Sequence, residues 1–196
     1  RYDLNLTLFS PEGQPPSRSR GSGVFVVSNG AGVATNTVDQ LSRSTCVAGM
    51  IDLKRDFEQG KITTAFDMVR TVRPDLDALV VNMISGIALA ADTAKAVERF
   101  CASVGGRIPV ILRFSGPRPD ENRSILSGLD QRNASVTLAE STRDLVEKTT
   151  ALFGIVPNAT ATANHLAEQV EAALEIRSRL GVTMDPEAWL TPDGTI

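Results

Sequence analysis

The chain has 196 residues, of which 42% are hydrophobic and 22% are charged, which is typical of a folded globular domain and not of a disordered or fibrous protein. Its formal net charge is −3 and 5% of its residues are aromatic, which argues against a groove for a phosphate backbone or a platform for stacked bases. No apolar run approaches the roughly 20 residues of a membrane helix. We therefore expect neither a nucleic-acid partner nor a membrane partner.

The first predicted element is a half-exposed strand, because residues 4–9 alternate between apolar and polar side chains. A loop rich in Pro, Ser, Gly and Arg follows at residues 10–22, and its composition predicts a connector without a core of its own. Anion binding by the arginines of this loop is the alternative. Nothing at the N-terminus resembles a signal peptide, and the first residue is Arg1 rather than Met, which is compatible with a piece processed or trimmed from a longer protein.

Strands and helices then alternate along the chain. Apolar runs predict strands at residues 24–27, 47–51, 76–84, 108–113 and 134–138. Apolar spacing and capping residues predict helices at residues 33–43, between Gly60 and Pro74, from Gly86 to 104, at 120–129 and at 142–153. Such alternation predicts βαβ units with helices on both faces of a parallel sheet. The expected fold class is α/β, a flavodoxin-like three-layer sandwich whose five-stranded parallel sheet has the order 2-1-3-4-5, with the N-terminal strand added.

The C-terminal part lies outside this alternation. Residues 164–180 show a charged amphipathic pattern that predicts a helix, which we expect to pack on its own domain rather than to clasp a partner. The predicted division is an N-terminal strand with its Pro/Arg-rich connector (residues 1–22), the flavodoxin-like domain (23–154) and a C-terminal helical extension (155–196).

Two cysteines, Cys46 and Cys101, stand beside apolar residues and are interpreted as small buried thiols. The chain has no CxxC and no His/Cys cluster, so we predict no metal site and expect a reducing, cytoplasmic location. The single histidine, His165, lies in the predicted C-terminal helix. No Ser/His/Asp set, carboxylate pair or GxxxxGK[ST] loop can be assembled, so we predict no catalytic residue in this chain.

Two glycine loops follow the first and third strands of the parallel set, where ligands bind in doubly wound folds. The first is Asn29-Gly30-Ala31-Gly32 and the second is Ser85-Gly86-Ile87. Glycine lets a ligand approach the backbone closely, and the helix after each loop offers free N–H groups to an anion. Either loop alone is equally compatible with a simple tight turn, but the pair predicts an anion site, to which Asn82 and Ser85 add side-chain donors.

Arg113 ends the fourth strand of the set and is the third candidate. Its guanidinium is suited to bidentate binding of a carboxylate or a phosphate, and a salt bridge to a neighbouring loop is the equal alternative. The predicted substrate- or phosphate-binding residues are Asn29, Gly30, Asn82, Ser85, Gly86, Ile87 and Arg113.

Four segments fit the motifs of one family in order and spacing. Residues 29–32 match its Asn-Gly-Ala-Gly turn, 81–87 its Val-Asn-Ile-Phe-Gly-Gly-Ile motif, 109–116 its Pro-Val-Val-Val-Arg-Leu-x-Gly strand and loop, and 127–129 its Ser-Gly-Leu. Over residues 4–153 the chain thus resembles the C-terminal CoA-ligase domain of the succinyl-CoA synthetase β-subunit family, whose relatives include malate–CoA ligase and ATP-citrate lyase.

The chain departs from that family at three places. Asp52 is followed by Leu53-Lys54-Arg55-Asp56-Phe57 instead of a glycine-rich run, and Ser85 replaces one glycine of the Gly-Gly pair. Of the Arg-Cys-Asp that usually follows, only Asp92 has a counterpart nearby. These changes bear on catalytic competence more than on the fold.

The resemblance implies a component of a nucleotide-dependent carboxylate–CoA (acid–thiol) ligase that acts on a small carboxylic acid. In such ligases a phosphorylated histidine of an α-type subunit lies between the N-termini of two helices, one from each subunit. By this resemblance Ser85-Gly86-Ile87 would hold the phosphate or the acid, and Asn29-Gly30 and Arg113 would line the cavity. The implied partners are an α-type subunit and an ATP-grasp domain or chain, which would bind most of the ATP or GTP, the Mg and the CoA.

Two alternatives stay open. A non-catalytic interaction or scaffold subunit derived from such a ligase would keep the fold and the partners without the activity. An unrelated flavodoxin-like module for flavin or another nucleotide is less favoured, because few aromatic residues are available to sandwich a ring.

Overall fold

The computed structural model describes residues 4–14, 21–54, 60–84, 87–117 and 119–155, with residues 87–89 described by their backbone alone. Two predicted features, Ser85-Gly86 and the helix at 164–180, therefore lie outside the described residues. Within the described part, no helix is both long enough and apolar enough to cross a membrane.

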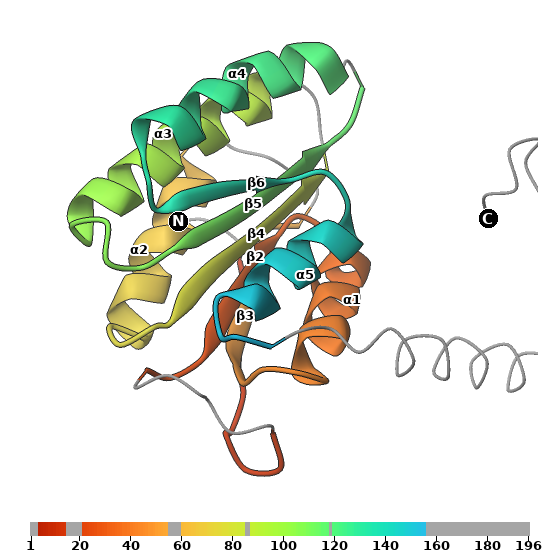
Figure 1. Ribbon diagram of the computed structural model, residues 1–196, viewed down its shortest axis with the longest axis vertical. Coiled ribbons are helices and arrows are strands. Elements are labelled where there is room, and N and C mark those ends of the chain that lie inside the picture. Colours follow the sequence, from red (N-terminus) through yellow and green to blue (C-terminus); the bar gives the residue numbers. More distant parts are fainter. Residues whose placement is uncertain (1–3, 15–20, 55–59, 85–86, 118, 156–196) are drawn as a thin grey trace, which may run out of the picture. The chain divides into compact units, whose positions relative to one another are not determined.

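The described strands form one six-stranded sheet. Their bounds are β1 (Asn5–Leu8), β2 (Val24–Ser28), β3 (Val47–Asp52), β4 (Ala78–Ile84), β5 (Val110–Ser115) and β6 (Val136–Ala139). The sheet order is β1-β3-β2-β4-β5-β6, in which β1 runs antiparallel to β3 and every other neighbouring pair is parallel (Figure 1). Counted along the chain from β2, the parallel strands stand in the order 2-1-3-4-5. The predicted flavodoxin-like α/β class is confirmed, with the N-terminal strand added at the edge beside β3.

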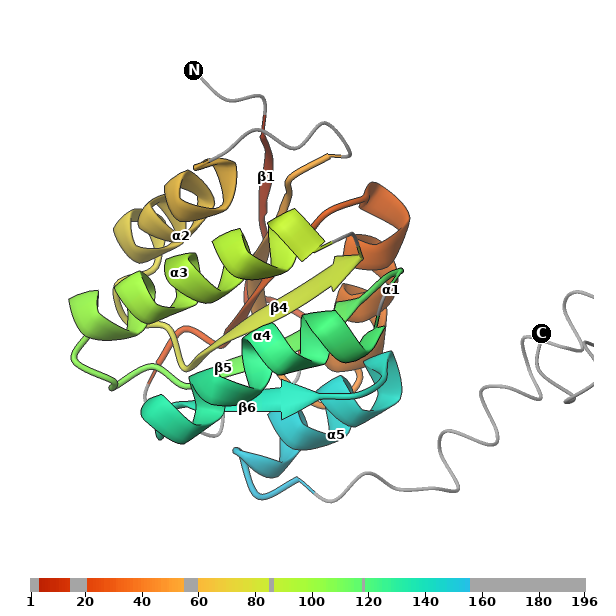
Figure 2. The same cartoon turned by 90° about the horizontal axis from the view of Figure 1, so that it is seen from above.

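The described residues also form five helices, which cover both faces of the sheet. Their bounds are α1 (Ala31–Ser42), α2 (Lys61–Val72), α3 (Ile87–Ser103), α4 (Pro119–Arg132) and α5 (Thr142–Ala151). Figures 1 and 2 show α2, α3 and α4 on one face and α1 and α5 on the other. Ser141 is the N-cap of α5, because its hydroxyl accepts a hydrogen bond from the Asp144 N–H at 3.0 Å.

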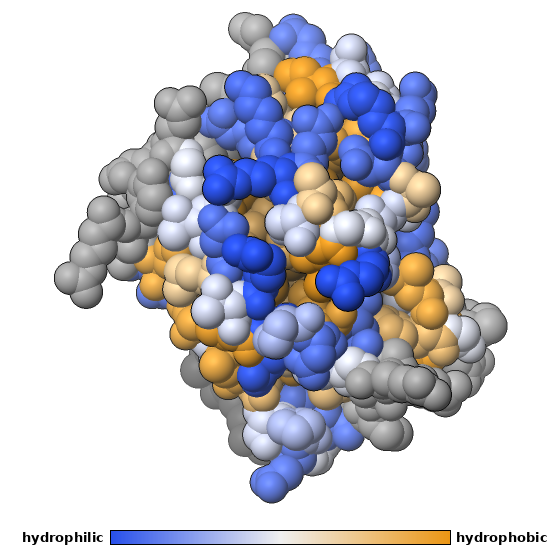
Figure 3. All heavy atoms as spheres, turned by 90° about the vertical axis from the view of Figure 1, so that its left-hand side faces the viewer, coloured by the Kyte–Doolittle hydropathy of each residue, from blue (hydrophilic) through white to orange (hydrophobic). Residues whose placement is uncertain are grey.

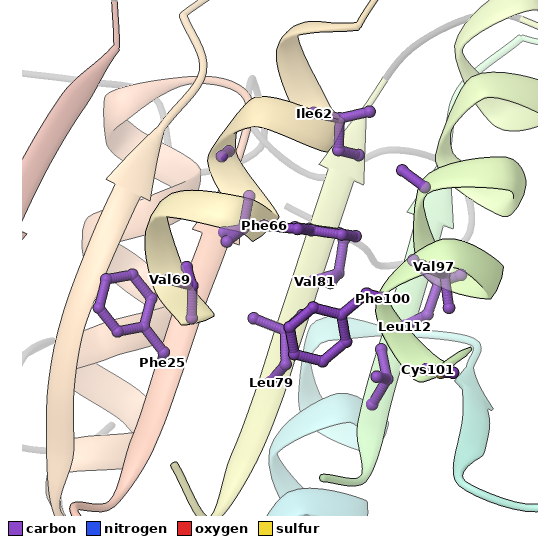
Figure 4. Close-up of a cluster of buried hydrophobic side chains, with 14 of the residues drawn as sticks. Phe25, Ile62, Phe66, Val69, Leu79, Val81, Val97, Phe100, Cys101 and Leu112 are labelled. Atoms are coloured by element: carbon purple, nitrogen blue, oxygen red, sulfur yellow. The ribbon is translucent and has the colours of Figure 1, made fainter. Parts of the chain in front are cut away.

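Apolar side chains fill the space between the sheet and the helices on both faces. On the face of α2, α3 and α4, the rings of Phe66 and Phe100 meet edge to face with centroids 5.6 Å apart (Figure 4). A smaller cluster covers the other face, with members from β2, β4, β5, α1 and α5 that include Val26, Val80, Ile111, Leu41 and Leu145. Strands β2 and β4 are covered on both faces, which explains why each is a nearly continuous apolar run in the sequence.

Two sequence predictions concern single residues of these elements. Cys46 and Cys101 are free and buried, as predicted, and burial raises the pKa of both thiols. Strand β5 begins at Val110 rather than at residue 108, because Pro109 has no N–H to donate to the ladder.

The outer surface of the helices is polar. Figure 3 shows hydrophilic residues over the middle of the side that faces left in Figure 1, with apolar residues visible between them. An exposed ion pair at 2.7 Å joins Arg132 of α4 to Glu98 of α3, and such exposed pairs contribute little to stability. This surface is typical of solvated helices, so the polar groups that need another explanation are those inside the fold.

Candidate functional site

Four polar side chains lie next to one another across β3, β2, β4 and β5. Ser28 is in register with Asp52 on one side and with Asn82 on the other. Asn82 is in register with Arg113. Residues in register in parallel strands present their side chains to the same face of the sheet. Arg113 is half-buried and the other three are buried. We call these four residues the polar row, and adjacent buried polar groups inside a sheet are uncommon enough to indicate a site.

Asn82 is the hydrogen-bonding centre of the polar row. Its Oδ1 accepts from Arg113 Nη1 at 2.9 Å, and its Nδ2 donates to Thr37 Oγ1 at 2.9 Å. Thr37 in turn donates from its hydroxyl to the Val33 carbonyl in the first turn of α1, at 2.8 Å. The side chain of Asn82 therefore joins β5 to α1 through the middle of the sheet.

Arg113 has more donors than partners. Its Nε is buried without a hydrogen-bond partner, and no carboxylate among the described residues forms an ion pair with it. Burial lowers the pKa of Arg113, because poorly solvated surroundings disfavour the charged form. The hydroxyl of Ser28, on the other side of Asn82 in the polar row, is also buried without a partner. A half-buried guanidinium that lacks a counter-charge is suited to an anion.

Asn29 holds the loop after β2 against the end of β4. Its Nδ2 donates to the Ile84 carbonyl and its Oδ1 accepts from the Ile84 N–H, both at 2.7 Å. Because both polar atoms of the amide are engaged, Asn29 orients the chain just before Ser85 in this arrangement. Each atom makes one bond, so one Nδ2 hydrogen and one Oδ1 lone pair remain for a ligand.

Gly30 and Asp52 lie at the same edge of the sheet, where β2 and β3 end. Gly30 has φ 123° and ψ 122°, a conformation that favours glycine. Its N–H donates to Asp52 Oδ1 at 2.8 Å, and the same oxygen accepts from the Lys54 N–H at 2.8 Å. Lys54 itself has a positive φ of 57°, which is unusual for a residue with a side chain. The carboxylate of Asp52 thus fixes the two loops that follow β2 and β3.

A cavity of about 700 Å³ opens at the start of α1. It is lined by residues 29–33 together with Asp52, Lys54 and Ile84. No side chain caps α1, so no capping side chain accepts a hydrogen bond from the N–H groups of its first turn. A methyl group added at Gly32 would meet no atom within 4 Å. The start of α1 therefore has room for a bound group beside its positive dipole end.

The structure places Asn29, Gly30, Asn82 and Arg113 at one edge of the sheet but in two places. Asn29 and Gly30 line the α1 cavity, whereas Asn82 and Arg113 belong to the polar row. Ser85 and Gly86 lie outside the described residues, and Ile87 begins α3.

Sequence analysis missed three residues of this arrangement, which are Ser28, Asp52 and Thr37. Asp52 had a detectable signal, since it is a charged residue directly after an apolar run and ends the strand beside β2. Thr37 had none, because a threonine in the middle of a helix is unremarkable until its partner across the sheet is known.

Comparison with known proteins finds relatives of this chain and solved structures that share its fold. The chain is 31% identical over 110 residues to the mitochondrial GDP-forming succinate–CoA ligase subunit β of Columba livia, a match that covers 55% of this chain and 28% of that protein. It is 30% identical over 99 residues to the ADP-forming succinate–CoA ligase subunit β of Syntrophotalea carbinolica, which covers 50% of this chain and 25% of that protein. The curated homologues of this chain are succinate–CoA ligase β subunits. The resemblance found in the motifs is confirmed.

These succinate–CoA ligase β subunits are much longer than the part they share with this chain. The matches span about a quarter of their length. No family model matches the chain.

Two solved structures share the fold at low sequence identity. One is ATP citrate lyase from Methanothrix soehngenii in complex with citrate and coenzyme A, with a TM-score of 0.52 and 17% identity over 74% of this chain and 41% of that one. The other is the apo form of a dinucleotide-forming acetyl-coenzyme A synthetase 1 from Ca. Korarchaeum cryptofilum, with a TM-score of 0.54 and 18% identity over 68% of this chain and 33% of that one. At this identity the likeness concerns the fold alone.

Proposed function

We propose that this chain is a component of a nucleotide-dependent carboxylate–CoA ligase and that it holds a carboxylate or phosphate group at the carboxyl edge of its sheet. The observation that carries the proposal is the half-buried Arg113 guanidinium, which has an unpaired Nε and no carboxylate partner among the described residues. The likeness to succinate–CoA ligase β subunits supports it.

The chain's own contribution to such a reaction is electrostatic. The positive ends of α1 and α3 and the cation of Arg113 lie at or near the same edge of the sheet, and all three favour a negatively charged group. Groups fixed in advance by the fold stabilise charge without needing to reorganise during the reaction. We assign this role to Asn29-Gly30, Asn82, Ser85-Gly86-Ile87 and Arg113. No acid or base from this chain is required.

The remaining chemistry is assigned to partners. No group of three or more His, Cys, Asp or Glu side chains in the described part of the chain is placed to hold a metal ion, and the sequence has no nucleotide phosphate loop. We therefore propose that an ATP-grasp domain or chain binds ATP or GTP with Mg, and that an α-type subunit supplies the phosphohistidine and most of the CoA contacts. The substrate is a small carboxylic acid, and the proposed location is the cytoplasm.

A second candidate is a non-catalytic subunit derived from such a ligase. It is favoured by one observation, which is that the Asp52 carboxylate already occupies the Gly30 N–H at the mouth of α1. A negative charge at this place reduces the pull of the helix end on a ligand. Such a subunit would assemble with the same partners and leave their activity unchanged.

Co-expression with an α-type chain and an ATP-grasp chain separates the two candidates. The complex should form ADP or GDP in a reaction that requires both CoA and a small carboxylic acid. Arg113→Met should lower kcat/KM by about 100-fold, as expected when a charged hydrogen-bond donor to the reacting group is removed. Arg132→Met, which removes an exposed arginine at the opposite edge, is the matched control and should have no effect. A complex that assembles but does not turn over, or in which Arg113→Met acts like Arg132→Met, would support the non-catalytic subunit.

A further inference from the structure

Asn82 occupies a position where an apolar residue would be expected. It lies in β4 between Val80 and Ile84, is 0% exposed, and interrupts the apolar side of the strand that faces α1 and α5. A buried amide needs a hydrogen-bond partner for each of its polar atoms, because an unpaired buried donor or acceptor destabilises the fold. Asn82 meets this requirement only because Arg113 and Thr37 are its partners. Strands β4 and β5 and helix α1 therefore meet at the Asn82 amide, at a position that a leucine could fill without hydrogen-bond partners.

The amide is neutral, which matters for Arg113. Its oxygen accepts one hydrogen bond from Nη1 and so fixes the guanidinium without cancelling its charge. The next residue of the polar row, Ser28, is also neutral. Asp52 lies on β3, which two strands separate from β5, and its Oδ1 already accepts from the Gly30 and Lys54 backbone. An Asp at position 82 would instead form a charge-assisted pair with Arg113.

We infer that Asn82 is a positioning residue, whose neutral amide holds the Arg113 guanidinium at the carboxyl edge of the sheet and keeps its positive charge available to an anion. Thr37 is its anchor, because the Thr37 hydroxyl accepts from Nδ2 and is itself fixed to the Val33 carbonyl. The inference deepens the proposed function and rests on it for the nature of the anion, a carboxylate or a phosphate group.

The test uses the full chain alone, labelled with ¹⁵N-arginine and observed through the Arg113 Nε–H resonance. That resonance is assigned by its absence in Arg113→Met. Sodium succinate and inorganic phosphate are titrated separately, so that the carboxylate and the phosphate sources are distinguished. In the unaltered chain at least one probe should produce a saturable shift of this resonance. Asn82→Asp should weaken binding by about tenfold or more, because its carboxylate neutralises the guanidinium, and Arg132→Met should leave it unchanged.

A second pair of variants keeps the test decisive if Asn82→Asp fails to fold. Thr37→Val removes the acceptor of Asn82 Nδ2 and should weaken binding by about threefold, since the amide loses one of its two bonds. Thr37→Ser retains the hydroxyl and should bind like the unaltered chain. The inference is overturned if folded Asn82→Asp binds as tightly as the unaltered chain, or if Thr37→Val and Thr37→Ser bind equally.

The outcome is distinguishable from that of the proposed function. If neither probe shifts the Arg113 resonance while the assembled complex still turns over, the inference fails and the ligase proposal stands. If the chain binds an anion in the Asn82-dependent way but no complex turns over, the inference stands and the ligase proposal fails.

Discussion

On the face covered by α2, α3 and α4 the sheet presents apolar residues along the whole length of its central strands, whereas the face covered by α1 and α5 changes from apolar to polar partway along. Strand β4 shows the contrast, because Leu79, Val81 and Met83 belong to the first face while Val80 and then Asn82 belong to the second. Side chains alternate between faces along a strand. The same strands therefore present apolar side chains to the core on one face and the candidate site on the other.

The apolar face should show the largest loss of stability when it is altered. Phe66→Ala removes a ring that is 2% exposed and packed against Phe100. We expect the free energy of unfolding to fall by about 3–5 kcal/mol, measured by urea denaturation. Leu152→Ala, which truncates a side chain that is 48% exposed, is the control and should change it by less than about 0.5 kcal/mol. If Phe66→Ala changes the free energy of unfolding no more than Leu152→Ala does, packing on this face does not provide the main stabilisation of the fold.

A substitution at Gly30, just before α1 on the other face, should have an intermediate effect on the free energy of unfolding, because of its backbone conformation. Gly30→Ala forces a side chain onto φ 123° and should lower the free energy of unfolding by about 1–2 kcal/mol. Gly32→Ala is the matched control, because Gly32 lies in α1 and an added methyl group meets no atom within 4 Å. It should leave stability unchanged or raise it by up to about 1 kcal/mol. Thermal denaturation of the pair measures the difference, and equal melting temperatures would contradict the strain at Gly30.

The contrast between the faces also marks the limit of what the sequence predicted. Alternating strands and helices, glycine loops and Arg113 were enough to predict the fold class and the edge of the sheet that carries the candidate site. The hydrogen bond from Asn82 to Thr37 was not predictable, because it joins residues 45 positions apart. Its existence depends on how α1 packs on the sheet, which no local pattern encodes. Likewise, nothing in the sequence indicates that both polar atoms of Asn29 bind the Ile84 backbone.

A pH-dependent effect should come from Cys101, a thiol on the apolar face. Burial raises its pKa above the ordinary value of 9.0, although a hydrogen bond with Ser135 opposes the shift. The unfolded thiol therefore ionises first, so the stability that the protonated thiol contributes is complete below pH 9.0 and declines as the pH rises toward the folded pKa. The free energy of unfolding of the unaltered chain should exceed that of Cys101→Ala by about 1 kcal/mol at pH 8. The difference should be smaller at pH 10, as measured by urea denaturation at both pH values. The difference in free energy of unfolding between the unaltered chain and Leu152→Ala should be the same at both pH values. If the difference between the unaltered chain and Cys101→Ala is also the same at both, the raised pKa is contradicted.

The smallest effect on stability should come from Arg113, the residue on which the proposed function depends most. Arg113→Met keeps an apolar stem of similar length and removes a poorly solvated cation, but it leaves Asn82 Oδ1 without its donor. These effects oppose each other and are similar in size, so the free energy of unfolding should change by less than about 1 kcal/mol in urea denaturation. Combining Arg113→Met with Asn82→Leu removes the unpaired oxygen as well, and the double variant should be at least as stable as the unaltered chain, as found when buried polar groups are replaced by apolar ones. A loss of more than about 2 kcal/mol in the double variant would mean that the polar row holds α1 and β5 in place. Both faces of the sheet would then stabilise the fold, one through apolar packing and the other through hydrogen bonds.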